Sequence, residues 1–584
     1  ANLKTGVTYV FRGRVVKKRG RMVMEQPEVF TPDSYQALAG SMQPVYGQTR
    51  GLSNKTIVRA QQMALEMRKM EREYMPPDLR RRYELAEINY AMEHIHFPAD
   101  QTELLFARKR LVFDEFFMFL VGVRRLKEHR EDRHSAFMIK ESEEVAAFQS
   151  SLPYALTGAQ ERALREVYGD MGSGLVMNRL IQGDVGSGKT IIAILALLEA
   201  AYNGYQGALM VPTEVLARQH FESMTGLFEK QGIEKVPVLV TGSMTAKEKR
   251  LAYAKIASHE ADIIIGTHAL IQEKVVYDNL ALVITDEQHR FGVGQRELLS
   301  SKGQEPHVLV MSATPIPRTL AIILYGDLDI SVIDELPAGR QTIKNCVVDP
   351  GYRPKAYAFI ERQVAEGHQA YVICPMVEES EMIEAENVLD YTKALRKALP
   401  PSVTVEYLHG KLKGKEKNAI MERFAAGEIH VLVSTTVIEV GVNVPNATVM
   451  MIENAERFGL AQLHQLRGRV GRGKDQSYCI MVNCSRDQGA GERLDILNRS
   501  NDGFYIASED LKLRGPGDIF GLRQSGDMEF KLADIFTDAN ILKKVSEEVN
   551  RLLDEDPQLE KDEHRDLKRK VEDYLGTNYE KLNL

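Results

Sequence analysis

The feature that most constrains the fold is a repeated alternation of short apolar runs with helical stretches between residues 153 and 485. Strands that are buried on both faces and joined by helices belong to parallel sheets. The runs fall into two series, which predicts two α/β domains in tandem. The first series comprises residues 208–211, 237–240, 262–266, 282–285 and 307–311, and the second comprises residues 370–374, 403–407, 430–434, 449–453 and 478–482.

The segments on either side of this region have other patterns. Residues 5–30 alternate like two strands around a turn at residues 18–21, and apolar residues recur at helical spacing over 53–73 and 102–133. A length of 584 residues suggests about four domains. We divide the chain into a strand segment at 1–45, a helical connector at 46–150, α/β domains at 151–335 and 336–485 that are joined by the linker Asp334–Gly339, and a helical C-terminal module at 486–584.

Composition excludes several classes of protein. Hydrophobic residues make up 44% of the chain and charged residues 27%, unlike collagen-like, mostly disordered or disulfide-scaffold proteins. The longest apolar stretches, residues 116–123 and 191–198, are less than half as long as a spanning helix. The four cysteines lack CxxC spacing, which predicts free buried thiols in a reducing compartment and no zinc site. Because residues 1–24 lack the apolar core of a signal peptide, we expect a cytoplasmic protein.

Charge alone does not favour a nucleic-acid binder, because the formal net charge is −7. Basic residues nevertheless crowd two short stretches, residues 12–21 and 467–474. Each cluster is either a solvated face or a contact to phosphates, and the pattern leaves both interpretations open.

The segment Gly183–Thr190 fits GxxxxGK[ST], follows an apolar strand and precedes a helix. Such glycines let backbone N–H groups surround phosphate oxygens at a helix N-terminus. The motif predicts that Lys189 reaches the β and γ phosphates of a nucleotide and that Thr190 ligates Mg²⁺. The nucleotide-binding residues expected here are Gly183, Asp184, Gly186, Ser187, Gly188, Lys189 and Thr190.

Two carboxylates follow the apolar run 282–285. Asp286 is expected to hold Mg²⁺ together with Thr190, and Glu287 to activate the attacking water. Adjacent acids are also common in solvated turns, so this interpretation depends on the phosphate-binding motif in the same chain.

Arginines beside small residues occupy Gln465–Arg472. Cations stabilise the charge that develops on a transferring phosphoryl group, so we expect Arg469 and Arg472 to act as arginine fingers. The alternative is a basic loop that contacts DNA phosphates, and Arg467 could serve that purpose by itself.

Taken together, these motifs resemble those of the superfamily 2 helicases. The segments that carry this resemblance, besides those above, are Leu156–Gln160, Val211–Glu214, Gly266–His268, Met311–Leu320 and Ser434–Val442. The resemblance implies RecA-like domains. It further implies that Gln160 reads adenine, that Gln465 contacts the nucleotide, and that coupling or DNA contacts are made by Ser312, Thr314, Thr435, Glu439 and Arg467.

Two further segments, Asp286–Val293 and Gly503–Asp518, resemble the RecG branch, and so does Glu93–Pro98 in the helical connector. The branch implies that Lys512 and Arg514 belong to a motif that couples nucleotide state to movement on duplex DNA. Family members also carry an N-terminal wedge domain with an oligonucleotide-binding fold, and we expect residues 1–45 to be its last strands.

The resemblance implies a monomeric ATPase that uses ATP and Mg²⁺. Its expected substrates are branched and duplex DNA, which it remodels by reversing stalled forks and migrating Holliday junctions. Single-stranded-DNA-binding protein is a candidate partner, and no membrane partner is expected. One rival hypothesis is a translocase similar to the transcription-repair coupling factor, which displaces bound protein. The other is a nucleic-acid binding module with a silent ATPase.

Overall fold

The computed structural model describes the chain except for residues 1–2, 19–20, 39–41, 48–51, 132–133, 287–297, 313–327, 338–340, 376–380, 436–443, 486, 515–529, 536 and 583–584. Its contacts divide the chain into two units. One consists of Ala1–Gly122 with Met528–Leu582, and the other contains Val123–Asp527. We describe each unit separately.

A parallel sheet of seven strands forms the first half of the larger unit, in the order β5-β6-β4-β7-β8-β3-β9. Its strands are β3 (Asn178–Gly183), β4 (Gln206–Met210), β5 (Pro237–Val240), β6 (Ile263–Gly266), β7 (Leu280–Asp286), β8 (His307–Ser312) and β9 (Asp329–Ile333). Its helices are α6 (Glu143–Ser151), α7 (Gly158–Gly172), α8 (Lys189–Tyr202), α9 (Glu214–Gln231) and α10 (Ala246–Ala257), with the 3₁₀ turn η1 (His268–Ile271). β4, β6 and β8 are buried along their whole length, which explains their continuous apolar sequences.

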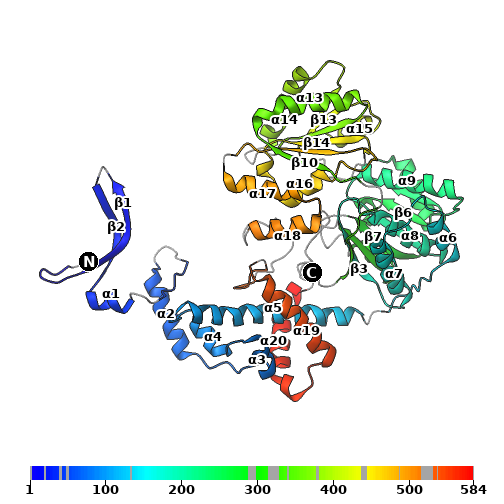
Figure 1. Cartoon of the computed structure of the whole chain (residues 1–584). Helices are drawn as coiled ribbons and strands as arrows, with labels where there is room; N and C mark the ends of the chain where they lie inside the picture. Colours follow the sequence, from blue (N-terminus) through cyan, green and yellow to red (C-terminus); the bar gives the residue numbers. More distant parts are fainter. Residues whose placement is uncertain are drawn as a thin grey trace. The chain divides into compact units, whose positions relative to one another are not determined.

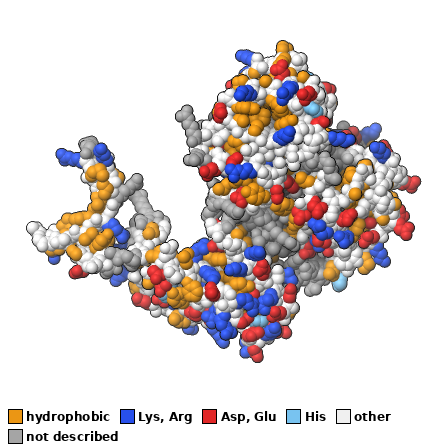
Figure 2. Space-filling model, viewed as in Figure 1, with side chains coloured by type: hydrophobic (Ala, Val, Ile, Leu, Met, Phe, Trp, Pro, Cys, Tyr) orange, Lys and Arg blue, Asp and Glu red, His pale blue; other side chains and the backbone are white. Residues whose placement is uncertain are grey.

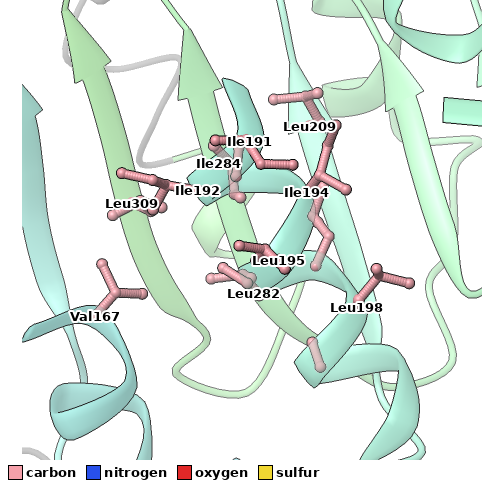
Figure 3. Close-up of a cluster of buried hydrophobic side chains, with 14 of the residues drawn as sticks. Val167, Ile191, Ile192, Ile194, Leu195, Leu198, Leu209, Leu282, Ile284 and Leu309 are labelled. Atoms are coloured by element: carbon pink, nitrogen blue, oxygen red, sulfur yellow. The ribbon is translucent and has the colours of Figure 1, made fainter. Parts of the chain in front are cut away.

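The core of this half lies around α8. Ile192 and Leu195 on the helix pack into the same cluster as Ile284 on β7 and Leu309 on β8 (Figure 3). Because α8 is buried over most of its surface, its sequence is apolar on all sides and shows no polar face. This packing fixes the start of α8 beside the end of β3.

A second parallel sheet, of six strands, has the order β10-β15-β14-β11-β13-β12. Its strands are β10 (Lys344–Val348), β11 (Gln369–Ile373), β12 (Val405–Leu408), β13 (Val431–Ser434), β14 (Ala447–Ile452) and β15 (Tyr478–Val482). The accompanying elements are η3 (Pro350–Tyr352), α13 (Arg353–Ala365), α14 (Glu381–Ala398), α15 (Gly414–Ala425), η5 (Ala455–Arg457), α16 (Leu460–Arg467), α17 (Gln488–Arg499) and α18 (Gly503–Arg514) (Figure 1).

The smaller unit combines the beginning and the end of the chain. Its elements are β1 (Val10–Lys18), β2 (Arg21–Phe30), α1 (Pro32–Leu38), α2 (Asn54–Met67), α3 (Pro77–Tyr83), α4 (Ile88–His94), most of α5 (Gln101–Glu131), α19 (Ala539–Glu555), η6 (Asp562–His564) and α20 (Arg565–Leu582). The strands β1 and β2 pair as an antiparallel hairpin. Hydrophobic side chains lie exposed along this hairpin, among them Phe11, Val15 and Met22 (Figure 2).

Long-range contacts attach the C-terminal helices to the connector. Arg108 of α5 forms an ion pair of 2.6 Å with Asp538, and the carboxylate of Glu115 accepts from the backbone N–H groups of residues 531–533. Phe116 and Phe119 of α5 are buried and make edge-to-face contacts with Phe530. Phe116 and Phe119 of the long helix are therefore core residues.

The predicted fold class, two tandem RecA-like parallel-sheet domains, is confirmed, and each predicted apolar run overlaps a strand. The helix expected over 53–73 ends at Met67 instead. Beyond it the backbone is held against α4, because the N–H of Glu71 donates to Asn89 Oδ1 and Arg68 donates to the Asn89 carbonyl. The strands β9 and β10 were not anticipated. The five-segment division and the wedge origin of residues 1–45 stay predictions.

Two expectations from composition can be compared with the structure. All four cysteines are free, as predicted. Cys374 and Cys479 are also buried, as predicted, whereas Cys346 and Cys484 are only partly buried. Burial raises the pKa of each of the Cys374 and Cys479 thiols to about 12. Within the part of the chain that the structure describes, no helix has the length and apolar character needed to cross a bilayer.

Candidate active site

The loop between β3 and α8 is tightly folded. Gly188 holds the N-cap position of α8 with a φ of +84°, and Lys189 is the first helical residue. A Cβ on Gly188 would lie 2.2 Å from Gln160 Nε2, and a Cβ on Gly183 would lie 2.6 Å from Ser187 Oγ. Both positions therefore require glycine, and the loop opens at a helix N-terminus, where anions are favoured.

The ammonium group of Lys189 lies inside this loop. Its Nζ donates to the carbonyl oxygens of Gly183 at 2.7 Å and Asp184 at 2.8 Å, and it lies 3.5 Å from Ser187 Oγ. Gly186, with a φ of +76°, helps to turn the backbone around it. The lysine thus occupies the centre of the loop, where it can exchange carbonyl partners for phosphate oxygens.

Gln160 reaches the loop from α7. Its side chain forms a capping box with Thr157, in which the Thr157 N–H donates to Gln160 Oε1 at 2.8 Å. Its Nε2 donates to the carbonyl of Ser187 at 2.8 Å. The side chain is buried and braces the phosphate loop, while its expected contact with adenine stays a prediction.

The partly exposed Asp286 is the last residue of β7, and the partly exposed Thr190 stands in the first turn of α8. Only β8 separates β7 from β3 in the sheet, so their carboxyl ends share one edge about 10 Å apart. The buried Ser312 ends β8 between them and pairs in register with Gln182 of β3. The expected metal ligands therefore lie at one edge, and both offer the oxygen atoms that Mg²⁺ prefers.

The helix α16 of the second half contacts the phosphate loop. His464 Nε2 lies 2.5 Å from Asp184 Oδ1. Gly468 also comes close, since a Cβ there would lie 2.7 Å from Val185 Cγ1. Gln465 is partly exposed on the same helix. Burial raises the pKa of Asp184, but hydrogen bonds from His464 and two backbone N–H groups outweigh burial, and the pKa lies below its ordinary value.

The three arginines of this segment have different surroundings. Arg467 is buried and donates to the carbonyls of Leu497 at 3.2 Å and Ser500 at 2.8 Å, at the end of α17. Arg469 is also buried, and Arg472 Nε donates to the Gly468 carbonyl at 3.2 Å. The coupling or DNA role expected of Arg467 and the finger roles of the other two stay predictions.

The structure places other expected residues only in part. Thr435 is buried directly after β13, and its N–H donates to the Leu408 carbonyl at 3.4 Å. Lys512 and Arg514 belong to α18, but their side chains lie outside the described part. Glu287, Thr314 and Glu439 lie outside the described residues altogether.

Three residues of this site were missed by the sequence analysis. His464 bonds to the phosphate loop, Gly503 donates its N–H to Asp184 Oδ2 at 3.1 Å, and Asp510 accepts from the first N–H groups of α16. His464 precedes a predicted motif, and the other two lie inside one. No spacing rule links them to a loop about 300 residues earlier in the sequence.

Comparison with known proteins finds three family models that match this chain. Residues 157–323 match the family model "DEAD/DEAH box helicase", residues 355–474 match "Helicase conserved C-terminal domain", and residues 500–580 match "ATP-dependent DNA helicase RecG, domain 3, C-terminal". The ATP-dependent DNA helicase RecG of Synechocystis sp. is 45% identical over 98% of this chain and 68% of its own length. That of Bacillus subtilis is 46% identical over 88% of this chain and 76% of its own length.

The chain belongs to the RecG family of ATP-dependent DNA helicases. A solved RecG bound to a three-way DNA junction matches it with a TM-score of 0.69 and 38% identity, over 91% of this chain and 70% of that one. The predicted family is therefore confirmed, and the protein is an ATP-using enzyme. The similarity to RecG extends beyond the two α/β domains, since it covers 98% of this chain and includes residues 500–580.

Proposed function

We propose that this RecG-family chain hydrolyses ATP to move along duplex DNA and thereby remodels branched DNA, reversing stalled forks and migrating Holliday junctions during recombination and repair. The observation that carries this proposal is the contact between the phosphate loop of the first sheet and α16 of the second, at Asp184 and His464. A nucleotide bound beside this contact can change how the two halves meet. The relative that was solved with a three-way junction supports branched DNA as the substrate.

In the proposed reaction, water attacks the γ-phosphorus and the bond from that phosphorus to the β–γ bridging oxygen breaks. Glu287 takes a proton from the water, and ADP and phosphate leave. Lys189 moves from its carbonyl partners to the β and γ oxygens, and Arg469 and Arg472 stabilise the charge that develops there. Gln160 and Gln465 contact the nucleotide.

Thr190 and Asp286 would hold Mg²⁺, because both present oxygen atoms at the same edge of the sheet. When it is bound, the ion neutralises charge on the phosphate oxygens. The protein's own contribution is to fix these two ligands on rigid elements, since α8 and β7 belong to one packed core.

Translocation follows from alternate closing and opening of the two halves. Binding of ATP draws Arg469 and Arg472 toward the phosphates, and hydrolysis releases them. We propose that one set of residues transmits this cycle to the DNA, as the family resemblance implies: Ser312, Thr314, Thr435, Glu439, Arg467, Lys512 and Arg514.

The chain is proposed to act as a monomer, because one chain supplies both sides of the contact between Asp184 and His464. The four free thiols support a reducing compartment, the cytoplasm. Single-stranded-DNA-binding protein is proposed as a partner on the family resemblance alone.

The test is phosphate release from ATP and Mg²⁺ with no DNA, linear duplex, or a model fork. We expect DNA to stimulate turnover, the fork to be remodelled, and omission of Mg²⁺ to stop both. A rate of ATP turnover that DNA does not change would contradict the proposal. ATP binding with no turnover under any of these conditions would establish the silent ATPase instead.

A further inference from the structure

The carboxylate of Asp184 joins three segments of the chain. Oδ1 accepts from the N–H of Val185 at 2.6 Å and from His464 Nε2 at 2.5 Å, and Oδ2 accepts from the N–H of Gly503 at 3.1 Å. The side chain is only 14% exposed. A phosphate loop needs backbone N–H groups, not a buried carboxylate, so binding of phosphate does not explain these contacts.

The tautomer of His464 follows from its two neighbours. Arg467 NH2 lies 2.6 Å from His464 Nδ1. A guanidinium can only donate, so Nδ1 accepts and Nε2 carries the proton that is donated to Asp184. Because Arg467 also donates to the carbonyls of Leu497 and Ser500, a continuous series of hydrogen bonds runs from the phosphate loop to the end of α17.

The helices α16, α17 and α18 form one packed assembly, which we call the α16–α18 body. Asp510 of α18 accepts from the N–H groups of Leu460 at 3.3 Å and Ala461 at 3.4 Å, at the start of α16. Ile506 of α18 is buried in the same core cluster as residues of α16 and α17. A displacement of α16 is therefore transmitted to α18.

The state of the loop acts directly on Asp184, since Lys189 Nζ donates to its carbonyl. Phosphate oxygens would draw the lysine away and bring negative charge toward the Asp184 carboxylate, which like charges disfavour. We propose that Asp184 is a positioning residue that links occupancy of the phosphate loop to the α16–α18 body, through His464 and the N–H of Gly503. Its link to movement on DNA rests on the proposed function.

The first test does not depend on activity. Hydrogen exchange of the Gly503 amide is measured in the full chain with and without a non-hydrolysable ATP analogue and Mg²⁺, with binding of the analogue confirmed by equilibrium dialysis. In the parent we expect the analogue to speed exchange about tenfold, because the amide loses its acceptor. In Asp184→Ala exchange should be fast in both states. An amide that the bound analogue leaves unchanged in the parent would overturn the proposal.

The second test measures base pairs of fork migrated per ATP hydrolysed. His464→Phe removes the donor to Asp184, and we expect the number of base pairs migrated per ATP to fall about tenfold, whatever the change in turnover itself. His464→Gln should restore it, since its amide can donate to Asp184 and accept from Arg467. A purely structural role would lower the thermal unfolding temperature and leave the ratio unchanged.

Arg499→Ala is the matched control, because Arg499 lies on α17 of the same body with a side chain that is 78% exposed, and it should keep the parental ratio. Adding Asp184→Asn to His464→Phe should lower the ratio no further than His464→Phe alone. If the parent lacks DNA-stimulated turnover, the proposed function fails and the exchange test still decides the link. If the parent is active and His464→Phe keeps its ratio, the link alone fails.

Discussion

Lys189 is the residue on which turnover should depend most directly. Its ammonium lies inside the phosphate loop on the carbonyls of Gly183 and Asp184, so it is already placed to receive phosphate oxygens. We expect Lys189→Ala to lower ATP turnover by at least about 10³-fold. The motif contains no second cation that could stabilise the charge on the phosphate oxygens in the transition state. Phosphate release measures this, with the exposed Lys230→Ala as control. A loss of less than tenfold would contradict the assignment.

Two glycines with similar backbone angles allow the effect of backbone strain to be measured apart from the effect of steric crowding. Gly188 and Gly204 have φ values of +84° and +80°, but a Cβ on Gly204 meets no atom within 4 Å, whereas one on Gly188 would displace Gln160. Each alanine substitution should cost about 1 kcal/mol of backbone strain. Only Gly188→Ala should also raise the KM for ATP, by about tenfold or more, since it disrupts the loop. Equal KM values in the two variants would show that Gln160 does not brace the loop.

At the scale of elements, Glu548 holds α19 against α3. Its side chain is 2% exposed, accepts from Arg82 at 2.8 Å and Tyr83 at 2.9 Å, and pairs with Arg551. Burial raises its pKa, but these hydrogen bonds outweigh burial and the pKa is lowered. Glu548→Gln removes the charge that pairs with Arg82 and Arg551. Because these two arginine side chains are 42% and 38% exposed and solvent screens them, we expect a loss of about 1 kcal/mol in the free energy of opening α19 at pH 7.

The pH dependence follows from the direction of that shift. A carboxylate with a lowered folded pKa stabilises above its unfolded pKa, about 4.3, and loses this effect as pH falls toward the folded value. The deficit of Glu548→Gln should therefore be complete at pH 7 and shrink below about pH 4. Hydrogen exchange of α19 measures it. Glu547→Gln is the control, since that side chain is 65% exposed and its deficit should be near zero. An equal loss in the free energy of opening α19 for both variants would show that Glu548 does not hold this helix against α3.

Sequence patterns located most elements because the buried parallel strands are continuous apolar runs. The strand β5, for example, begins at Pro237 and ends at Val240, as the apolar run 237–240 predicts. The strands β9 and β10 were missed because each lies at a sheet edge and mixes polar with apolar residues, as in Asp329–Ile333 and Lys344–Val348. These two strands form because they pair with strands that are distant in the sequence, and a local sequence pattern does not reveal such pairing.

The candidate site was predictable to a similar extent. The loop at Gly183–Thr190 and the strand end at Asp286 have local signatures, so sequence located them. The contact of His464 with Asp184 spans 280 positions and has no such signature. Arg467 shows a further limit, because its basic motif gives no sign that its side chain donates to the Ser500 carbonyl at the end of α17.

At the scale of the whole molecule, turnover should need residues from both halves. Arg469 and Arg472 follow α16, the helix that contacts the phosphate loop. We expect Arg469→Ala or Arg472→Ala to lower turnover on the order of 10³-fold with little change in DNA affinity. The control is Arg499→Ala on α17, whose side chain is 78% exposed. A variant that hydrolyses ATP normally but loses DNA would instead favour the basic-loop hypothesis.

The last prediction concerns how a chain with a net charge of −7 binds a polyanion. The average charge repels DNA, so affinity has to come from local Lys and Arg contacts to phosphates, and each contact releases counterions. We therefore expect affinity for a model fork and for linear duplex to fall steeply with salt, on the order of 10³-fold between 50 and 200 mM for several phosphate contacts.

Lys189→Ala should keep the parental slope, because its ammonium faces the nucleotide loop. Titrations by fluorescence anisotropy at four salt concentrations measure both slopes. A salt-independent affinity would mean that shape and stacking, rather than backbone charge, hold the DNA.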